Sequence, residues 1–422
     1  MLDQRFVRNN LDTVKQAVAN KNERIDVDKF INLDTQRREL LQTSESLKQQ
    51  RNTVSDEVAH LKRIGEDTSA QIEAMREVGT RIKGIDTELA EINDLLQDLL
   101  ARLPNIPHPS VPVGVDDSAN VEVRRWGSTS DVNFERKAHW DISEALDIID
   151  FQRAGKISGS HFVLFKGNGA RLQRALIQFM LDLHIQKHGY TEIIPPYIVN
   201  RQSMFGTGQL PKMEEDMYHA EIDDLFLIPT AEVPVTNMHR DEILAEEELP
   251  IYYTAYSPCF RREAGSYGRE TRGLIRVHQF DKVEMVKFVH PETSYDELET
   301  LVTNAEEVLK LLAIPYRVVA LSTGDLSFAA AKCYDLEAWA PGVNRWLEVS
   351  SCSNFEDFQA RRSGIRYRDK AGKSQFVHTL NGSGMGMART LIALIEHYQT
   401  EQGYIRIPEV LVPYMGGLTE IN

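Results

Sequence analysis

The chain has few cysteines and no long hydrophobic run. Its 422 residues include only Cys259, Cys333 and Cys352, and no two of them form a Cys-x-x-Cys pair. This argues against a disulfide scaffold and a cysteine zinc cluster, and it suits a reducing compartment. No segment approaches the roughly 18 apolar residues of a membrane span, and the first residues lack the apolar core of a signal peptide. We therefore expect a cytoplasmic protein that has no membrane partner.

Two common nucleotide-binding signatures are also missing. No Gly-x-Gly-x-x-Gly follows a strand-like run, and there is no Gly-x4-Gly-Lys-Ser/Thr, which argues against a Rossmann or P-loop ATP site. Basic residues do not predominate either, since the net charge is −15. That charge counts mildly against a nucleic-acid binder, although local patches rather than the net charge determine such binding.

The N-terminal part carries heptad repeats. Apolar residues recur every seven positions from Leu33 to Leu61 and, after a polar break at residues 65–69, in steps of three and four from Met75 to Leu103. This pattern predicts an antiparallel helical hairpin whose helices are about 42 Å long. Polar residues occupy the positions where the first helix should carry a second apolar stripe (Arg37, Ser44, Arg51). One amphipathic helix in the first 25 residues is expected to pack at the base of this arm.

Proline ends the helical part. The stretch PNIPHPSVPVG begins at Pro104 and holds four prolines, so it cannot continue a helix. We expect an N-terminal helical domain with a coiled-coil arm (1–103), a linker (104–115) and a second domain (116–422). Helices and short strands mix in the second domain without a βαβ alternation. An α+β fold, an antiparallel sheet flanked by helices, therefore fits best.

The most informative stretch is Cys259–Phe280, CFRREAGSYGRETRGLIRVHQF. Arg261 and Glu263 end one apolar segment, a polar loop follows, and a second apolar run closes the stretch. Such a hairpin would bring an arginine fork and a carboxylate to one place, and arginine suits phosphate or carboxylate ligands. For a lone Phe-Arg-x-Glu, a hairpin with solvated salt bridges would be the better interpretation.

The complete pattern, FR-x-E-A-G-S-x-G-R-x-T-R-G-L-x-R-x-H-Q-F, resembles motif 2 of class II aminoacyl-tRNA synthetases, in the form typical of the seryl-tRNA synthetase family. The resemblance extends over nearly the whole chain. Residues 171–196 resemble motif 1, which forms the dimer interface in the family, and Asn381–Ile395 (NGSGMGMARTLIALI) resembles motif 3. The glycines of motif 3 are expected to let the backbone approach a ligand closely. The resemblance implies a homodimer with a class II catalytic domain and a tRNA-binding arm.

By resemblance, two arginines carry the catalysis. Arg261 would hold the α-phosphate of ATP and the serine carboxylate, and Arg389 would contact the γ-phosphate. Glu263 would face the adenine amino group, and Phe280 would stack on the adenine ring. The serine carboxylate is already ionised, so its attack on the α-phosphate needs no protein base. Catalysis would come from positioning and charge stabilisation.

The resemblance also implies further contacts with ATP. Val277 would line the nucleotide site. Arg262 belongs to the same ATP-binding stretch, although the family usually has a small residue there. The remaining ATP-binding segment consists of four consecutive residues: Glu348, Val349, Ser350 and Ser351. Oxygen atoms of the first and last of these suit a Mg²⁺ ion that bridges phosphates.

Serine selection would rest on five residues, implied by the same resemblance: Thr230, Ala231, Glu232, Glu284 and Ser383. Carboxylates suit the ammonium group of serine and accept a hydrogen bond from its hydroxyl. A site built to bind a hydroxyl rejects analogues that lack it, because its buried polar groups then stay unpaired.

The implied activity is ATP-dependent ligation of L-serine to tRNA(Ser) through a seryl-adenylate, with tRNA(Sec) as a further substrate that the family commonly serves. The loop between Ala264 and Gly273, which contains Arg269, would contact the acceptor end of the tRNA. Cations of the arm would contact phosphates: Lys48, Arg51, Lys62, Arg63 and Arg76.

Two alternatives remain open from the sequence. An adenylating paralogue could load a carrier other than tRNA, but such a relative would be expected to lack the long arm. A non-catalytic scaffold with the same fold would be expected to have lost Arg261, Glu284 or Arg389, and all three are present.

Overall fold

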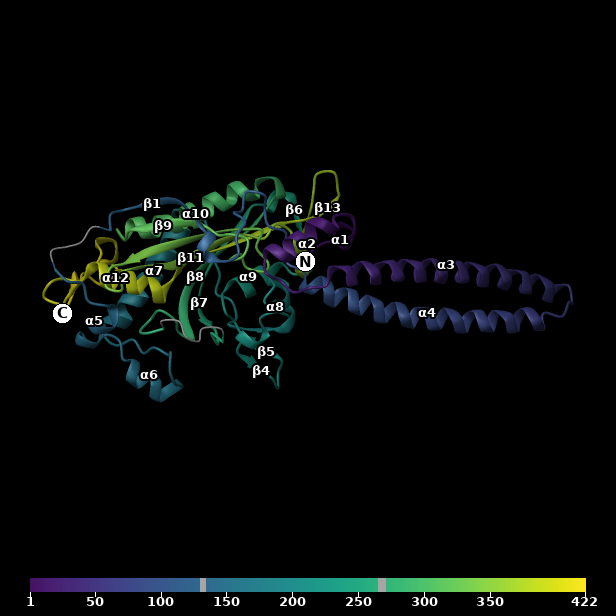
Figure 1. The fold of residues 1–422 in the computed structure, drawn as a ribbon, viewed down its shortest axis with the longest axis horizontal. Helices are drawn as coiled ribbons and strands as arrows, with labels where there is room; N and C mark the ends of the chain where they lie inside the picture. The colour runs from purple at the N-terminus through teal and green to yellow at the C-terminus, as the bar shows by residue number, and fades with distance from the viewer. Residues whose placement is uncertain (130–133, 265–270) are drawn as a thin grey trace. The chain divides into compact units, whose positions relative to one another are not determined.

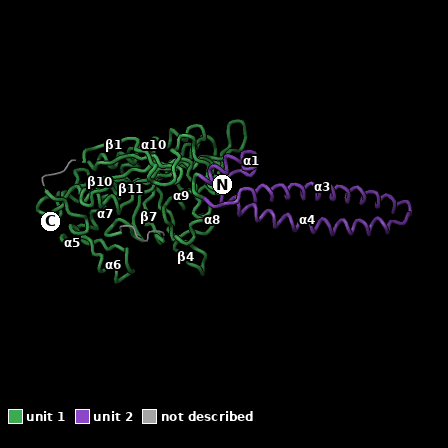
Figure 2. The backbone as a smooth tube through the Cα atoms, in the orientation of Figure 1, with its two compact units in different colours: residues 1, 20–22, 104–422 green, residues 2–19, 23–103 purple. Residues whose placement is uncertain are grey.

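The computed structural model describes residues 1–129, 134–264 and 271–422 (Figure 1). The chain divides into two compact units (Figure 2). Unit 2 comprises residues 2–19 and 23–103, and unit 1 comprises residues 1, 20–22 and 104–422. Within the described ranges, no helix combines the length and the apolar composition needed to cross a bilayer.

Two long helices, α3 (Val27–Arg63) and α4 (Ser69–Arg102), form the arm in unit 2. They run antiparallel, because Lys48 pairs with Asp86 at 3.1 Å while Arg37, nearer the start of α3, donates to Asn93 at 2.6 Å. The predicted turn lies between the two helices, where Gly65 adopts a positive φ of 85°. The helical hairpin predicted from the heptads is therefore confirmed.

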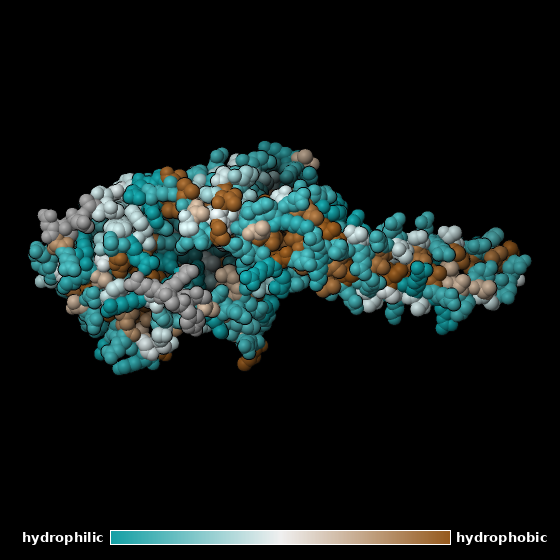
Figure 3. All heavy atoms as spheres, viewed as in Figure 1, coloured by the Kyte–Doolittle hydropathy of each residue, from teal (hydrophilic) through white to brown (hydrophobic). Residues whose placement is uncertain are grey.

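The two helices contribute unequally to their shared seam. The apolar stripe of α4 is buried: Ile82, Ile85, Leu89, Ile92 and Leu96. On α3 the leucines are only half-buried, and the buried positions include Asp34 and Ser44. The Ser44 hydroxyl donates to Asp86 at 3.2 Å, so a polar position of α3 serves a hydrogen bond across the pair. Figure 3 shows hydrophobic side chains along these helices among largely hydrophilic neighbours.

The expectation of one continuous N-terminal helix was wrong. The segment forms α1 (Gln4–Asn9) and α2 (Leu11–Asn20), which are separated by Asn10. Asn10 departs from helical geometry (φ −131°, ψ 45°) and caps the end of α1, and its side-chain amide donates to the carbonyl of Phe6. The packing expectation holds, since Arg8 donates to Asp34 of α3 at 2.6 Å.

Unit 1 is built on an eight-stranded sheet with the order β1-β9-β10-β11-β14-β8-β7-β2. In that order the strands are Val121–Trp126, Tyr316–Ala320, Lys332–Ala340, Arg345–Asn354, His378–Gly386, Gln279–Val289, Ile251–Phe260 and Thr191–Glu192. Every pairing is antiparallel except the one between β2 and β7. The expectation of an antiparallel sheet with flanking helices is confirmed.

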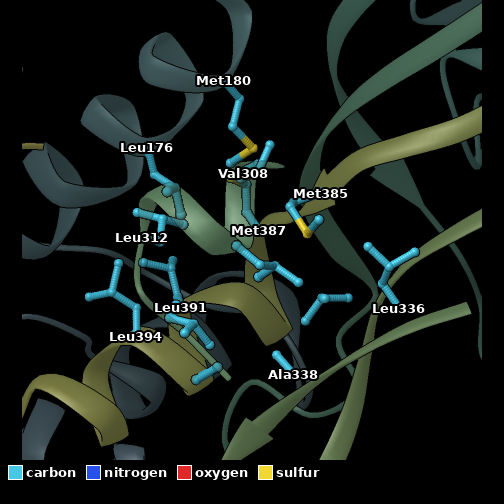
Figure 4. Close-up of a cluster of buried hydrophobic side chains, with 14 of the residues drawn as sticks. Leu176, Met180, Val308, Leu312, Leu336, Ala338, Met385, Met387, Leu391 and Leu394 are labelled. Atoms are coloured by element: carbon cyan, nitrogen blue, oxygen red, sulfur yellow. The ribbon is translucent and has the colours of Figure 1, made fainter. Parts of the chain in front are cut away.

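Three helices cover one face of this sheet: α7 (Asn168–Gln186), α10 (Ser294–Leu311) and α12 (Met387–Tyr398). Figure 4 shows their apolar side chains meeting those of β10 and β14. Helix α7 presents Leu172, Leu176, Phe179 and Met180 to this core at helical spacing. Motif 1 therefore has the helix and short strand that the sequence predicted, although β2 itself spans only two residues.

Shorter elements complete unit 1. The helices are α5 (His139–Ala145), α6 (Phe151–Ser158), α8 (Arg201–Thr207), α9 (Glu232–Thr236) and α11 (Phe358–Ser363). The strands are β3 (Ile198–Asn200), β4 (His219–Ala220), β5 (Leu225–Leu227), β6 (Ile243–Ala245), β12 (Arg366–Arg368), β13 (Ser374–Phe376), β15 (Ile405–Arg406) and β16 (Glu420–Ile421). Helices α9 and α11 pack on the sheet face opposite the main core, and α8 packs against these two helices.

Leu89→Ala tests the seam of the arm. Leu89 is 7% exposed, and truncating a buried leucine typically costs about 2–5 kcal/mol. We expect faster amide hydrogen exchange throughout α3 and α4, with exchange in the sheet of unit 1 unchanged. Leu95→Ala is the control, since Leu95 on the same helix is 46% exposed. Equal effects of the two variants would contradict the assignment of the seam.

Candidate active site

A cavity of about 610 Å³ opens in unit 1 on the sheet face opposite α7, α10 and α12. Strands β8, β11 and β14, the start of α9 and the start of α12 contribute to its wall. Residues proposed from the sequence that line it are Thr230, Glu232, Arg261, Glu263, Val277, Phe280, Glu348, Val349, Ser351, Ser383 and Arg389. The remaining proposed residues, Ala231, Arg262, Glu284 and Ser350, lie outside the lining.

The hairpin of β7 and β8 brings an arginine beside an aromatic ring. Cys259 pairs with Phe280 across the hairpin, and Arg261 lies just beyond the end of β7. Its guanidinium stands 5.2 Å from the centre of the Phe280 ring, and its Nε donates to the carbonyl of Pro229 at 3.4 Å. A flat ring and a fixed cation thus lie next to each other, as recognition of a nucleotide requires.

Only part of the connection between these strands lies within the described residues. Residues 265–270, and with them Arg269, lie outside. Strand β8 begins only at Gln279, because Leu274 and Ile275 turn into the core and Gly273 takes a φ of 70°. Glu263 forms an ion pair with Arg276 at 2.7 Å, so its carboxylate faces an arginine.

Arg262 points away from the cavity. Its backbone N–H donates to the carbonyl of Asp216, and its guanidinium lies 5.4 Å from the centre of the Tyr218 ring. The side chain therefore packs on Tyr218, just before β4, and does not line the cavity that contains Phe280.

A bulge in β11 brings Glu348 and Ser351 to one face. In a regular strand, side chains three positions apart point to opposite faces. Here Leu336 pairs with Ser350 and Glu337 with Glu348, so Val349 is an extra residue between two pairs. Glu348 and Ser351 both line the cavity, whereas Ser350 is buried and donates to the carbonyl of Ser383 at 2.6 Å.

Arg389 lies against the same part of β11. Its Nη1 donates to the Glu348 carbonyl at 3.0 Å and lies 3.3 Å from the Glu348 carboxylate. Its Nε donates to the carbonyl of Ile275 at 3.3 Å. Motif 3 therefore places its arginine beside the candidate oxygen ligands of a metal ion.

A second bulge lies in β14. Ser383 pairs with Glu284 and Met385 with Val283, which leaves Gly384 without a partner on β8. A Cβ atom on Gly384 would come 2.7 Å from Nε2 of His184, and one on Gly382 would come 2.8 Å from the Cys352 sulfur. These two glycines are thus required by packing on the core side, not by a ligand as expected. Only Gly386 of the three lines the cavity.

Two carboxylates lie close together at this site: Glu232 lines the cavity, and Glu284 lies behind the lining residues Thr230, Lys282 and Asn381. Glu284 is fully buried, accepts hydrogen bonds from Thr230 (2.9 Å) and Asn381 (3.0 Å), and forms an ion pair with Lys282. Glu232, the first residue of α9, is 6% exposed. Burial, and next the charge of Glu284, raise the pKa of Glu232 to about 7. A buried carboxylate beside another carboxylate favours a bound cation.

Matches with known proteins cover both units. Residues 1–107 match the family model of the seryl-tRNA synthetase N-terminal domain, and residues 214–398 match that of the tRNA synthetase class II core domain (G, H, P, S and T). A serine–tRNA ligase of Geobacter sulfurreducens is 56% identical over 100% of both chains. One of Thermodesulfovibrio yellowstonii is 58% identical over 99% of both chains. The chain belongs to the seryl-tRNA synthetase family.

Solved structures of seryl-tRNA synthetases superpose on the complete chain. The Pyrococcus horikoshii enzyme complexed with ATP has a TM-score of 0.95 at 40% identity, covering 100% of this chain and 99% of its own. The cytoplasmic Naegleria fowleri enzyme in complex with AMP has a TM-score of 0.88 at 31% identity, with the same coverage. The family and fold inferred from the three motifs are therefore confirmed.

Sequence reasoning missed polar residues that complete this seryl-tRNA synthetase cavity. Lys282 lies two positions before Glu284 on β8, and Asn381 lies two positions before Ser383 on β14; both line the cavity. The period of two in a strand was the available signal, since each missed residue shares a face with a proposed one. Gln359, which donates to Glu232 at 2.7 Å, had no comparable signal because it comes from a separate helix.

Glu232→Gln tests the buried carboxylate through stability. The folded pKa of Glu232 lies above its ordinary value of 4.5, at about 7. Its contribution to stability is therefore fully present below pH 4.5 and is lost as the pH rises to 7. At 1.36 kcal/mol per pKa unit the cost above pH 7 is about 3 kcal/mol. We expect the variant to be more stable than the wild type at pH 8 but not at pH 4.5, measured by urea unfolding without serine. Glu247→Gln, at an exposed site, is the control. A gain in stability of Glu232→Gln that is the same at both pH values would contradict the raised pKa of Glu232.

Proposed function

We propose that this chain activates L-serine with ATP to form seryl-adenylate and pyrophosphate, and then transfers the seryl group to the terminal ribose of tRNA(Ser). The single observation that carries the proposal is the composition of one cavity. Its lining includes the buried Glu232, with Glu284 directly behind it, and Arg261 beside the Phe280 ring. The first arrangement suits an amino acid, and the second suits ATP.

The activation step follows from these groups. The adenine stacks on Phe280, and the fork of Arg261 binds the α-phosphate together with the serine carboxylate. That carboxylate is ionised at neutral pH and attacks the α-phosphorus while the bond to pyrophosphate breaks. Arg389 stabilises the charge on the leaving phosphates. Positioning and preorganised charge supply the rate enhancement, as in other phosphoryl-group chemistry without a protein nucleophile.

Mg²⁺ fits the face that the β11 bulge creates. Glu348 and Ser351 would hold it, since both offer oxygen atoms to the cavity beside Arg389. Mg²⁺ is commonly bound by one or two protein oxygens plus substrate phosphates and water. When bound, the ion neutralises phosphate charge.

Serine selection uses the part of the cavity around Glu232. Glu232 and Glu284 take the ammonium and hydroxyl groups of serine, together with Thr230 and Ser383. Glu284 is already held by Thr230, Asn381 and Lys282, so its side chain loses little conformational entropy when serine binds. The two carboxylates disfavour substrates that lack a matching donor.

The parts of the chain have separate roles in this proposal. Residues 1–103 form the tRNA-binding domain, residues 104–115 are a linker, and residues 116–422 form the catalytic domain. Lys62 and Arg63 end α3 beside the turn of the arm, and both are exposed, as contact with tRNA phosphates requires. The formed arm disfavours the alternative of a relative that loads a different carrier.

The remaining assignments concern assembly and cellular context. The chain forms a homodimer through motif 1, comprising α7 and β2, as in the rest of the family. It acts in the cytoplasm, where its three buried and unpaired cysteines stay reduced. Its tRNA substrates include tRNA(Sec), which the family commonly serves.

Arg261→Ala tests the catalytic role of the Arg261 guanidinium group. Loss of a preorganised donor to developing charge typically costs about 3 kcal/mol, or roughly 10²-fold in rate. We expect serine-dependent ATP–pyrophosphate exchange to fall by at least that factor while circular dichroism stays unchanged. Arg317→Ala on β9 is the control, because Arg317 pairs with Glu337 away from the cavity. A folded Arg261→Ala variant with wild-type exchange would exclude Arg261 from the site.

Reversing the charge of both Lys62 and Arg63 tests the arm. The double variant Lys62→Glu with Arg63→Glu should weaken tRNA binding and reduce the slope of log affinity against log salt by about 2. Pyrophosphate exchange should not change, since that reaction involves no tRNA. Lys370→Glu, an exposed cation of unit 1, is the control. Unchanged tRNA affinity and salt slope would show that the tip of the arm does not contact tRNA.

A further inference from the structure

Gln359 connects the serine end of the cavity to the sheet behind it. This residue of α11 is 1% exposed. Its Oε1 accepts a hydrogen bond from the Thr379 hydroxyl at 2.7 Å. Its Nε2 donates to Glu232 at 2.7 Å and to the carbonyl of Thr207 at 3.2 Å. Gln359 does not itself line the cavity.

These contacts fix which end of the amide faces Glu232. The Thr379 hydroxyl supplies a donor to Oε1, and the Thr207 carbonyl can only accept. A flipped amide would place Oε1 against both the ionised Glu232 carboxylate and the Thr207 carbonyl, and none of these three groups has a proton to donate. The network therefore presents an N–H group to the ionised form of Glu232.

A hydrogen-bond donor favours the ionised form of a carboxyl group. The groups around Glu232 have opposing effects on its pKa. Burial and the charge of Glu284 raise its pKa, whereas the hydrogen bond from Gln359 and the charges of Lys282 and Arg261 lower it, with a result of about 7. Because this value lies near neutrality, the loss of one hydrogen bond would change the ionised fraction of Glu232 at neutral pH.

We propose that Gln359 is a positioning residue for substrate selection: held by Thr379, it keeps Glu232 ionised and aimed into the cavity, ready for the ammonium group of serine. The proposal rests on the role of Glu232 in serine binding. It extends the serine site by two residues, Gln359 and Thr379, that never touch the substrate.

A purely structural role would have a different signature. Gln359 also joins α11 to the end of α8 through Thr207 and to β14 through Thr379. If that were its only role, its loss would lower stability at every pH and would leave the pH dependence of serine binding unchanged. The pH profile of the serine KM separates the two roles.

The experiment measures the KM for serine by ATP–pyrophosphate exchange between pH 6 and 8.5. For the wild type we expect the KM to rise below pH 7, approaching tenfold per pH unit, as Glu232 becomes protonated. In Gln359→Leu the inflection should move up by about one pH unit, because a donor to a charged group is lost. At pH 7 the KM should then be about fivefold higher, and it should recover by pH 8.5. The KM for ATP should not change.

Two further variants make the result decisive. Thr379→Val leaves Gln359 in place but frees its amide to rotate, so it should move the inflection in the same direction by less. Asn237→Ala is the matched control. Asn237 donates to the carbonyls of Ser203 and Val233 near the same helices, so its loss should lower stability without moving the inflection.

Glu232→Gln distinguishes the failure of each idea. If this variant keeps the wild-type serine KM, Glu232 is not part of the serine site and the proposed role of Glu232 fails. If it raises the KM and removes the pH dependence while a folded Gln359→Leu retains the wild-type inflection, the role of Gln359 is wrong. Should Gln359→Leu not fold, Thr379→Val decides, and an unmoved inflection in that variant overturns the proposal.

Discussion

Two bulges in adjoining strands determine where the polar groups of the cavity point. Strands β11 and β14 pair directly, with Cys352 opposite Gly382, and each contains an extra residue, Val349 or Gly384. Without the first bulge, Glu348 and Ser351 would lie on opposite faces of the sheet. Without the second, Ser383 and Gly386 could not both line the cavity. The parts of the cavity proposed to bind phosphate and serine therefore depend on the same departure from strand alternation.

The bulges are held from both sides of the sheet. The Ser350 hydroxyl donates to the Ser383 carbonyl, which ties one bulged strand to the other. On the opposite side, the His184 ring fills the space next to Gly384. Since His184 belongs to α7, the helix that resembles the dimer motif packs directly behind the strand that carries Ser383. A sheet distorted at two neighbouring positions needs such support, because bulges disrupt the local hydrogen-bond ladder.

Much of this architecture could be predicted from the sequence, for identifiable reasons. The heptads predicted the arm because helical spacing is a local property, and the proposed site residues came from the resemblance of the sequence to a known family. The break at Asn10 was missed because the apolar pattern continues through it, while the backbone conformation of this one residue does not. The bulges were missed because register depends on partner strands. Gln359 was missed because its contact with Glu232 joins residues 127 positions apart.

In the proposed mechanism the cavity acts through charge rather than through protein bases. Glu232 and Glu284 lie together out of water, which destabilises the protein without a bound cation, and Lys282 offsets only part of that repulsion. In the proposed mode of binding, the ammonium group of serine supplies the missing positive charge. Serine binding and the stability of this part of the cavity would then be linked, since each contributes to the other by thermodynamic necessity. An amino acid that leaves one carboxylate without its donor gains less of this energy, and so the repulsion that weakens the empty site also sharpens its selectivity.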